Sequence, residues 1–296
     1  MKVECLIPKR NNGNYFPAAI ESLINQSSGY SRILISENHS TDGSFETTLA
    51  CANPARNIEV IVPPSPLSSF GENVAFLLEH VREDTDYVHI ASSDDIWLPT
   101  FLSEILKFII EQNGPNLVFC DRFIISEAEK ILDVTGSLTI PTAVCPPQSF
   151  PFYVQGCMYI IAGALIKADL ARRTASLLRQ THFSADWILM MESARDGAVS
   201  YLASPLFLYR HHPNSSTHLG KKHAEALSVY HLWLVEQNAV KEAEILSEKH
   251  LKSSGAATKS HESKFRQLRG HPSLLHLKLY ACKLGLLKFI RRFRGL

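Results

Sequence analysis

The stretch that decides the fold is residues 87–97, which read Tyr-Val-His-Ile-Ala-Ser-Ser-Asp-Asp-Ile-Trp. Its first five residues have strand-forming character and a small polar turn follows, so Asp94 and Asp95 are expected at the carboxyl end of a strand. Ligands bind at this edge of open α/β sheets. Adjacent carboxylates repel each other unless a cation, a hydrogen-bond donor or water lies between them, and a divalent metal carrying a nucleotide diphosphate would satisfy the pair. The alternative is a solvated turn that caps a helix starting at residues 97–99.

The same order of strand, polar loop and helix recurs before this stretch. Strands are expected at residues 3–7, 31–35 and 58–62, a helix with Pro17 in its first turn is expected to end near residue 26, and another should span 72–81. Residues 9–14 are expected to form a polar loop after the first strand. This alternation predicts a largely parallel sheet. The loops after the first, second and fourth strands converge at one edge, which gathers Arg10, Asn11, Glu37, Asp42, Asp94 and Asp95.

A second polar run, residues 35–44, reads Ile-Ser-Glu-Asn-His-Ser-Thr-Asp-Gly-Ser. Together with Pro8 at the end of the first strand and residues 92–97, it resembles the family 2 glycosyltransferases of the GT-A fold. Three further matches fall in family order: Asn11 with the helix ending at Asn25-Gln26, then Ser184-Ala185-Asp186-Trp187, then Tyr209-Arg210-His211-His212-Pro213 with Ser215 and Ser216. The resemblance covers about residues 1–217 and implies a Rossmann-like GT-A sheet. One departure is Ser92, because the family often carries Asp-x-Asp-Asp.

The resemblance implies a nucleotide-sugar donor and a divalent cofactor, Mn²⁺ or Mg²⁺. Asp94, Asp95 and His212 are the expected metal ligands, and which of the two aspartates binds the metal stays open. Glu37 lies where the family places an acidic contact to the nucleobase, which favours a uracil- or thymine-type base and therefore a UDP- or dTDP-sugar. Arg210 is the expected diphosphate contact, in a loop that orders over the donor. The full set of expected donor-binding residues is Pro8, Arg10, Asn11, Glu37, Asp42, Asn73, Ser93, Asp94, Asp95 and Arg210.

Asp186 is the candidate catalytic base. Inverting transfer needs one carboxylate to take the proton from the acceptor hydroxyl while the diphosphate leaves from the opposite side. Asp186 begins a helix-like segment, so it is also a candidate helix cap contributing about 1 kcal/mol. Glu192 is the reserve base, although a solvated or paired side chain is the simpler interpretation.

Composition limits the other functional classes. Net charge is +1 over 296 residues, which argues against a broadly basic nucleic-acid binder. Six cysteines without paired spacing suggest neither a zinc site nor a disulfide framework, and a reducing cytosol fits best. No signal peptide and no apolar run long enough to span a bilayer are found. A cytoplasmic location, including the inner face of the cell membrane, is therefore expected.

Residues 218–296 are expected to form a helical, basic C-terminal extension to a catalytic domain at residues 1–217. Apolar residues recur at helical spacing from 223 to 246, residues 253–258 break the pattern, and residues 274–294 form a second helical segment rich in Leu and Lys. Residues 141–151 are Pro-rich and, with residues 156–163, are candidates for the acceptor side.

The expected function is metal-dependent, inverting transfer of a sugar from a nucleotide-diphosphate donor to a hydroxyl of a glycan or lipid-linked glycan, in surface polysaccharide synthesis. The alternative from another class is a non-catalytic nucleotide-sugar or polyanion-binding protein on the same fold, which the serine at position 92 favours. Donor hydrolysis distinguishes the two, because a protein that only binds releases no diphosphate.

The basic tail predicts peripheral contact with an anionic membrane. No acidic residue follows Glu262, whereas eight basic residues from Arg266 to Arg294 are interleaved with leucines, and each basic residue near an anionic surface adds about 1 kcal/mol. We expect the full chain to co-sediment with anionic vesicles at low salt, and truncation after Glu262 to abolish this while sparing donor hydrolysis. Equal binding by both forms would instead make the tail a packing or oligomerisation element.

Overall fold

The computed structural model describes residues 1–134, 143–145, 150–154, 157, 159–181, 184–213 and 223–248. Within them, ten strands form one sheet: β1 (Val3–Lys9), β2 (Arg32–Glu37), β3 (Ile58–Ile61), β4 (Tyr87–Ile90), β5 (Ile96–Trp97), β6 (Leu117–Ile125), β7 (Ile131–Val134), β8 (Ala143–Cys145), β9 (Ala164–Lys167) and β10 (Val199–Arg210). The helices are α1 (Phe16–Ile24), α2 (Phe45–Leu49), α3 (Phe70–Leu78), α4 (Phe101–Glu111), α5 (Phe150–Tyr153), α6 (Ala168–Arg173), α7 (Ala175–Thr181), α8 (Ala185–Asp196), α9 (His223–Glu236) and α10 (Val240–Leu246), with 3-10 turns at Pro54–Arg56 and Ile161–Gly163.

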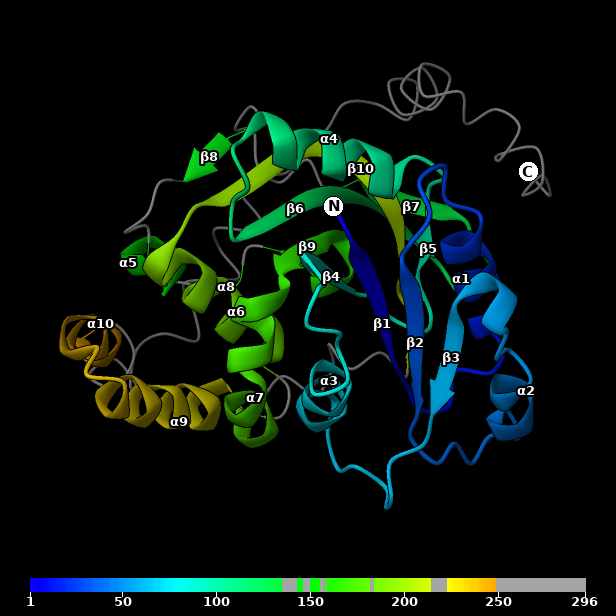
Figure 1. Cartoon of the computed structure of the whole chain (residues 1–296), viewed down its shortest axis with the longest axis horizontal. Helices are drawn as coiled ribbons and strands as arrows, with labels where there is room; N and C mark the ends of the chain where they lie inside the picture. Colours follow the sequence, from blue (N-terminus) through cyan, green and yellow to red (C-terminus); the bar gives the residue numbers. More distant parts are fainter. Residues whose placement is uncertain are drawn as a thin grey trace.

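The central sheet is mostly parallel, as predicted. Its strand order is β3-β2-β1-β4-β9-β6-β10-β5, with β7 on β6 and β8 on β10. Strands β3, β2, β1 and β4 are parallel neighbours, while β9 and β5 run antiparallel to the strands beside them. The chain winds outward from β1 in both directions, to β2 on one side and β4 on the other (Figure 1). This reversal of strand order is the place where an open α/β sheet forms a ligand crevice.

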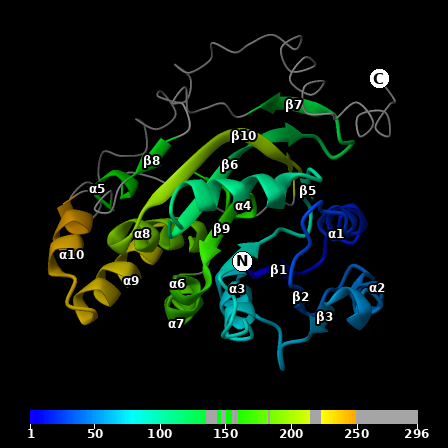
Figure 2. The ribbon, with the colours of Figure 1, turned by 45° about the horizontal axis from the view of Figure 1, so that its top comes forward.

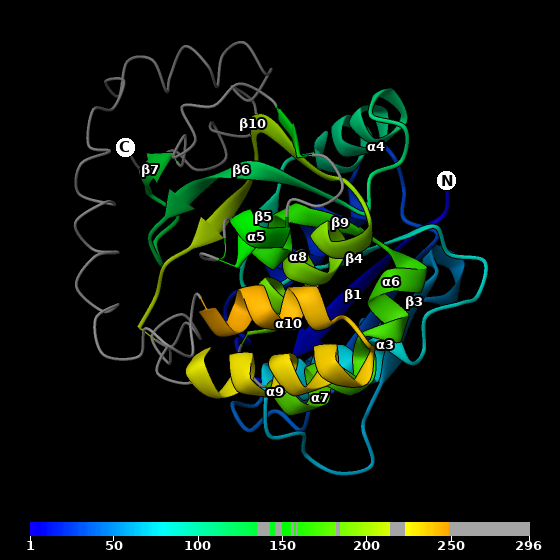
Figure 3. The ribbon, with the colours of Figure 1, turned by 90° about the vertical axis from the view of Figure 1, so that its left-hand side faces the viewer.

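Helices cover both faces of the sheet because its strands are apolar on both sides. On β1, Leu6 faces a core formed with α3 and α6–α10, whereas Cys5 and Ile7 face a second core formed with α1 and α4. This alternation is the strand period of two. Figure 2 shows α4 on one face with α6 and α7 on the other, and Figure 3 shows α9 beside α7 with α10 packed on α9.

Most expected elements are present, and four differ. Lys9 is the last residue of β1 instead of a loop residue, and residues 96–97 pair with β10 as strand β5, so the next helix begins at Phe101. The apolar runs at 199–202 and 206–209 predict two strands, but they form one strand, β10, with irregular register between them. The helix expected from 223 to 246 is divided into α9 and α10, where Asn238 has a φ of 57°.

Helices α9 and α10 share the core of the preceding residues. Leu227, Tyr230 and Leu234 of α9 are buried in the same cluster as α7 and α8, and the Tyr230 hydroxyl donates to Oε1 of Glu192 at 2.5 Å. A domain boundary at residue 217 stays a prediction. The predicted segment at 274–294, the break at 253–258 and most of the Pro-rich loop lie outside the described residues. Among the described helices, none is long and apolar enough to cross a membrane.

Both ring nitrogens of His89, on β4, have partners among residues of the core on the α1 and α4 side. Its Nε2 lies 2.9 Å from the backbone oxygen of Ala162, and its Nδ1 lies 2.7 Å from the hydroxyl of Tyr30. Burial lowers the pKa of His89 to about 4. The fold therefore holds the imidazole neutral.

We expect this histidine to make folding sensitive to acid. An unfolded histidine titrates near pH 6.5, so between about pH 6.5 and 4 the unfolded chain binds the additional proton and stability falls as pH falls. The loss attributable to His89 is about 2–3 kcal/mol at pH 4.5. His89→Gln should flatten the dependence of the unfolding free energy between pH 7 and 4.5, measured by urea denaturation, whereas His80→Gln, at an exposed histidine, should not. Equal slopes for all three proteins would contradict this.

Candidate functional site

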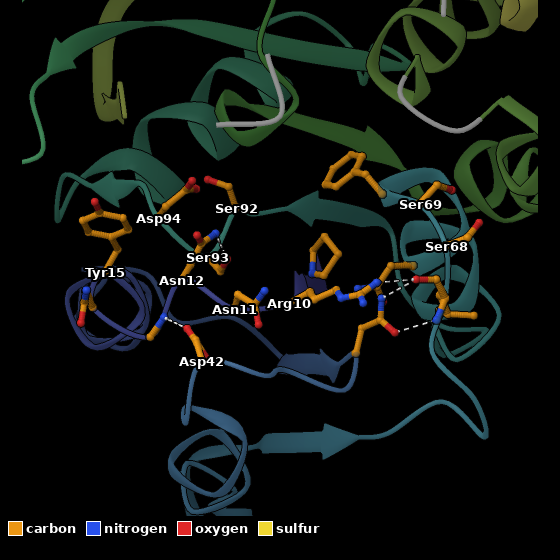
Figure 4. Close-up of a pocket in the computed structure, with 17 residues that line it drawn as sticks. Arg10, Asn11, Asn12, Tyr15, Asp42, Ser68, Ser69, Ser92, Ser93 and Asp94 are labelled. Carbon is orange, nitrogen blue, oxygen red and sulfur yellow. Dashed lines mark hydrogen bonds between the residues drawn. The ribbon is translucent and has the colours of Figure 1, made fainter. Parts of the chain in front are cut away.

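A pocket of about 680 Å³ opens at the carboxyl ends of β1, β2 and β4, where the strand order reverses. This volume is in the range of small-molecule sites. Asp94 and Tyr15 lie at one end, Ser68 and Ser69 lie at the other, and Arg10 lies between them (Figure 4). The pocket is lined by Pro8, Arg10, Asn11, Asn12, Gly13, Asn14, Tyr15, Asn38, Asp42, Leu67, Ser68, Ser69, Phe70, Asn73, Ser92, Ser93 and Asp94.

The loop after β1 is fastened to the loop after β2. The backbone nitrogen of Asn11 donates to Oγ of Ser40 at 2.8 Å, and the Asn11 side-chain oxygen accepts from the backbone nitrogen of Thr41 at 2.8 Å. Asn11 and Asn12 both have left-handed backbones, with φ of 61° and 64°, a conformation that asparagine tolerates better than most residues. A side chain at Gly13 would place its Cβ 2.7 Å from Cβ of Ser44, so this close approach requires glycine.

Asp42 also fixes the loop after β1, through a hydrogen bond to its backbone. Its Oδ2 accepts from the backbone nitrogen of Gly13 at 2.8 Å, and its Oδ1 accepts from Oγ of Ser44 at 2.5 Å. Burial would raise the pKa of Asp42, but the hydrogen bonds from Ser44 and Gly13 outweigh burial and lower it. Asp42 is therefore a carboxylate that shapes the loop at the pocket edge.

One end of the pocket combines apolar surfaces with two amide side chains. Pro8, Leu67 and Phe70 contribute the apolar surface. Asn38 donates to the backbone oxygen of Leu67 at 3.0 Å and accepts from its backbone nitrogen at 2.7 Å. Asn73, in the first turns of α3, is buried, and its side-chain oxygen has no hydrogen-bond partner in the described structure. An unpartnered buried acceptor in a pocket wall is a place for a ligand donor.

The other end of the pocket holds Asp94 and Asp95, which differ in exposure and in hydrogen-bond partners. Asp94 lines the pocket, and its Oδ2 lies 2.8 Å from Nε2 of His212. Asp95 is 1% exposed; its oxygens accept from Oγ of Ser92 at 2.5 Å and from the backbone nitrogen of Arg210 at 2.8 Å. Burial, followed by the charge of Asp94, raises the pKa of Asp95. Asp94 is therefore the carboxylate that faces a ligand, and Asp95 fixes the turn and the end of β10.

Arg210 lies behind the pocket and not in its lining. Its Nε donates to the backbone oxygen of Asp94 at 2.8 Å, its Nη1 donates to the backbone oxygen of Glu127 at 3.1 Å, and its Nη2 pairs with Glu129 at 2.9 Å. The guanidinium also lies 4.8 Å from the centre of the Tyr15 ring. Arg210, at the end of β10, therefore joins the turn after β4 to the connection between β6 and β7. Its role as a diphosphate contact stays a prediction.

Glu37, the expected contact to the nucleobase, does not line the pocket. Glu37 is fully buried and outside the pocket lining, and its Oε2 lies 3.0 Å from Nζ of Lys9. Strand alternation explains this, because Glu37 has the parity of Ile33 and Ile35, which face α1. The next residue, Asn38, is the one at the pocket.

Asp186 lies in the first turn of α8 and outside the pocket lining. Its Oδ1 accepts from the backbone nitrogen of Trp187 at 2.8 Å. The N-cap position of α8 is held by Ser184, so Asp186 is a first-turn residue and not the expected helix cap. Glu192, the reserve base, is fully buried and bonded to Arg195 and Tyr230. Glu192 is therefore a paired core residue, and the alternative of a solvated side chain is wrong.

The pocket brings together seven of the expected binding residues and leaves others out. The seven are Pro8, Arg10, Asn11, Asp42, Asn73, Ser93 and Asp94. The sequence did not single out Asn12, Asn38, Tyr15 or the segment 67–70. Asn38 could have been found from the strand alternation, because Ile35 faces the core and Asn38, three residues later, therefore faces the opposite side. Residues 67–70 come from a Pro- and Ser-rich connection without periodicity, which gives no such signal.

Within the described residues, no three His, Cys, Asp or Glu side chains are arranged to hold a metal. Asp94 and His212 nevertheless supply one carboxylate oxygen and one ring at the pocket end, and Nδ1 of His212 is buried without a partner. A cation that also binds substrate phosphates needs only one or two protein carboxylates. These donors therefore fit Mn²⁺ or Mg²⁺ when a diphosphate completes the coordination.

Comparisons with known proteins agree on one fold. The model of the family described as Glycosyl transferase family 2 matches residues 5–168. The Staphylococcus aureus protein TarS, residues 1–349, is similar with a TM-score of 0.63 at 15% identity, covering 90% of this chain and 79% of that chain. Its complex with UDP-GlcNAc gives a TM-score of 0.65 at 13% identity, with coverage of 90% and 79%.

A third similar structure is the mannosyltransferase PcManGT from Pyrobaculum calidifontis in complex with GDP-Man and Mn²⁺. Its TM-score is 0.53 at 11% identity, covering 99% of this chain and 82% of that chain. None of the curated proteins matches the chain. The identities are low, so the likeness to these structures concerns the GT-A fold.

Proposed function

The chain belongs to glycosyl transferase family 2, and from this we propose that it transfers a sugar, with inversion, from a nucleotide-diphosphate donor to a hydroxyl of a glycan or lipid-linked glycan. The observation that carries the proposal is a single pocket with an apolar, amide-lined end and a carboxylate end. A nucleotide sugar has matching parts, because its base is flat and partly apolar and its diphosphate is anionic. Surface polysaccharide synthesis is the proposed setting.

The base subsite is proposed at the end formed by Pro8, Leu67, Phe70 and Asn73. The unpartnered oxygen of Asn73 would accept the ring N–H of a uracil or thymine. Guanine also presents a ring N–H, so selection between the two rests on the size of the apolar walls. UDP- and dTDP-sugars are the proposed donors, and TarS is a similar structure that contains UDP-GlcNAc.

The diphosphate subsite is proposed between Arg10 and Asp94. Arg10 is exposed in the pocket, with Nη1 bonded only to the backbone oxygen of Leu67 at 3.2 Å among its described contacts. Asp94 and His212 would hold Mn²⁺ or Mg²⁺, which would stabilise charge on the departing diphosphate. Ser92 occupies the position of a missing carboxylate, and its hydroxyl holds Asp95 in place.

Asp186 is proposed as the base that accepts the proton of the acceptor hydroxyl. It lies in the first turn of α8, where the partial positive charge of the helix N-terminus favours a carboxylate. It is half-buried. A carboxylate in this place fits proton acceptance from a hydroxyl bound nearby.

The proposal is tested by donor hydrolysis and binding with the full chain. In MnCl₂, we expect release of UDP from UDP-GlcNAc or another UDP-sugar, and weaker turnover of GDP-mannose. Asp94→Asn should raise the Kd for UDP in Mn²⁺ by about tenfold or more while the melting temperature stays within a few degrees, because the carboxylate faces the pocket and not the core. Asp84→Asn, at an exposed carboxylate beside Lys2, is the matched control. Unchanged manganese dependence in Asp94→Asn would remove this site, and absence of nucleotide binding by the wild type would remove the function.

The second experiment separates binding from chemistry at Asp186. Asp186→Asn keeps the size and hydrogen-bonding oxygen of the side chain but accepts no proton, so kcat should fall about a hundredfold or more with the Kd for UDP nearly unchanged. Glu192→Gln is not a suitable comparison, because it disrupts a buried pair. Full turnover by Asp186→Asn would exclude it as the base. Nucleotide binding without any turnover in the wild type would favour the non-catalytic alternative.

A further inference from the structure

A fully buried ion pair lies directly behind the pocket. Lys9 and Glu37 are the last residues of β1 and β2, they are register partners, and both side chains are 0% exposed. They face the α1 side, where Nζ of Lys9 lies 5.4 Å from the centre of the Phe16 ring. Neither residue lines the pocket, although Pro8 and Arg10 on either side of Lys9 do.

The ammonium group of Lys9 has three N–H donors, and three acceptor oxygens surround it. It donates to Oε2 of Glu37 at 3.0 Å, to Oγ of Ser40 at 3.1 Å and to Oγ of Ser44 at 2.7 Å. The other oxygen of Glu37 accepts from the backbone nitrogen of Ser40 at 2.7 Å. The pair thus fixes both serines of the loop after β2.

Each serine passes this constraint to the loop that forms the pocket floor. Oγ of Ser40 accepts from the backbone nitrogen of Asn11 at 2.8 Å. Oγ of Ser44 donates to Asp42, whose other oxygen accepts from the backbone nitrogen of Gly13 at 2.8 Å. The two hydrogen-bonded paths end on the residues that flank Asn12, whose side chain donates to Oγ of Ser93 at 3.1 Å beside Asp94.

Stability alone does not explain a charged pair at this position. Well-packed apolar residues of similar volume often replace buried ion pairs without loss of stability. The two paths end on Asn11 and Gly13, and the loop between them has left-handed backbones at Asn11 and Asn12, a conformation that persists only where surrounding contacts hold it. A geometrical role for the pair accounts for both observations.

We propose that Lys9 and Glu37 are positioning residues, which hold the loop of residues 10–15 in the shape that receives the diphosphate of the donor. They act through Ser40 and Ser44 on the backbone nitrogens of Asn11 and Gly13 and touch neither donor nor acceptor. The inference rests on the proposed function for its consequence in donor binding. The loop geometry itself does not depend on that function.

The chain offers a matched control. Glu4 and Arg32 are also register partners on β1 and β2, and they form a buried ion pair at the opposite, amino ends of the strands. The test variant is Lys9→Met/Glu37→Gln, and the control is Arg32→Met/Glu4→Gln; both remove a pair without leaving an unpaired charge. Ser44→Ala cuts one path at its middle and leaves the ion pair in place.

The first measurement is amide hydrogen exchange of Asn11 and Gly13 in the full chain without ligand. We expect exchange at both amides to accelerate about tenfold or more in Lys9→Met/Glu37→Gln, and at Gly13 alone in Ser44→Ala, with no change in the control. Unchanged exchange in the test variant would overturn the proposal, as would equal acceleration in the control. If the test variant does not fold, Ser44→Ala decides, since unchanged exchange at Gly13 then overturns the proposal.

The second measurement is donor binding and turnover with UDP and UDP-GlcNAc in MnCl₂. The Kd for UDP should rise about tenfold in the test variant, kcat should change by less than about threefold, and adding Ser44→Ala to that variant should have no further effect, because the path is already broken. Altered exchange with an unchanged Kd would overturn the link to donor binding. If the wild type binds no nucleotide, the proposed function is refuted. The hydrogen-exchange result then tests the effect of the ion pair on the loop by itself.

Discussion

The structure depends on the burial of β1 between two parallel neighbours. All seven residues of β1 are buried, and β2 and β4 bond to its two edges. A strand in this position cannot shift register without moving its apolar residues to the wrong face. Its carboxyl end is therefore a fixed point, and the loops that leave β1, β2 and β4 meet there in one pocket. The carboxylate of Asp94 and the amide of Asn73 reach the same cavity for this reason, although they are distant from most of the lining in sequence.

Much of the fold follows from the sequence, and the exceptions have physical causes. Alternating apolar segments with polar ends predicted β1 to β4 and their parallel order, because both the strand period and the crossover helices leave local signals. Residues 96–97 gave no such signal, since a two-residue strand is defined only by its antiparallel partner β10. The position of Lys9 was missed for a related reason. A lysine after proline is typical of a loop, and its burial is possible because Glu37, Ser40 and Ser44, from the next strand and the loop after it, accept from its ammonium group.

The candidate site shows the same limit at the level of single side chains. The edge of the sheet and seven of its residues could be predicted, because strand ends are visible in the sequence. The motif did not show that Glu37 is buried while Asn38 lines the pocket, since neighbouring residues along the strand direction face opposite sides. The sequence placed Arg210 after the last strand, but it did not show that the guanidinium bonds to the backbone oxygens of Asp94 and Glu127 and to the carboxylate of Glu129. Long side chains can turn in several directions, and sequence patterns do not encode the choice.

Helices α9 and α10 show whether the segment that matches the family is a separate structural unit. The family match ends at residue 168, yet the core on the α3 side continues without interruption through Tyr230 to Leu246. The phenolic hydroxyl of Tyr230 is bonded to Glu192 of α8, and removal of α9 would leave that buried carboxylate with one partner fewer. Residues 5–168, which match the family, therefore do not form a separate module, because part of their core is completed by later helices. The shared core favours inheritance of the described residues up to Leu246 as a single piece.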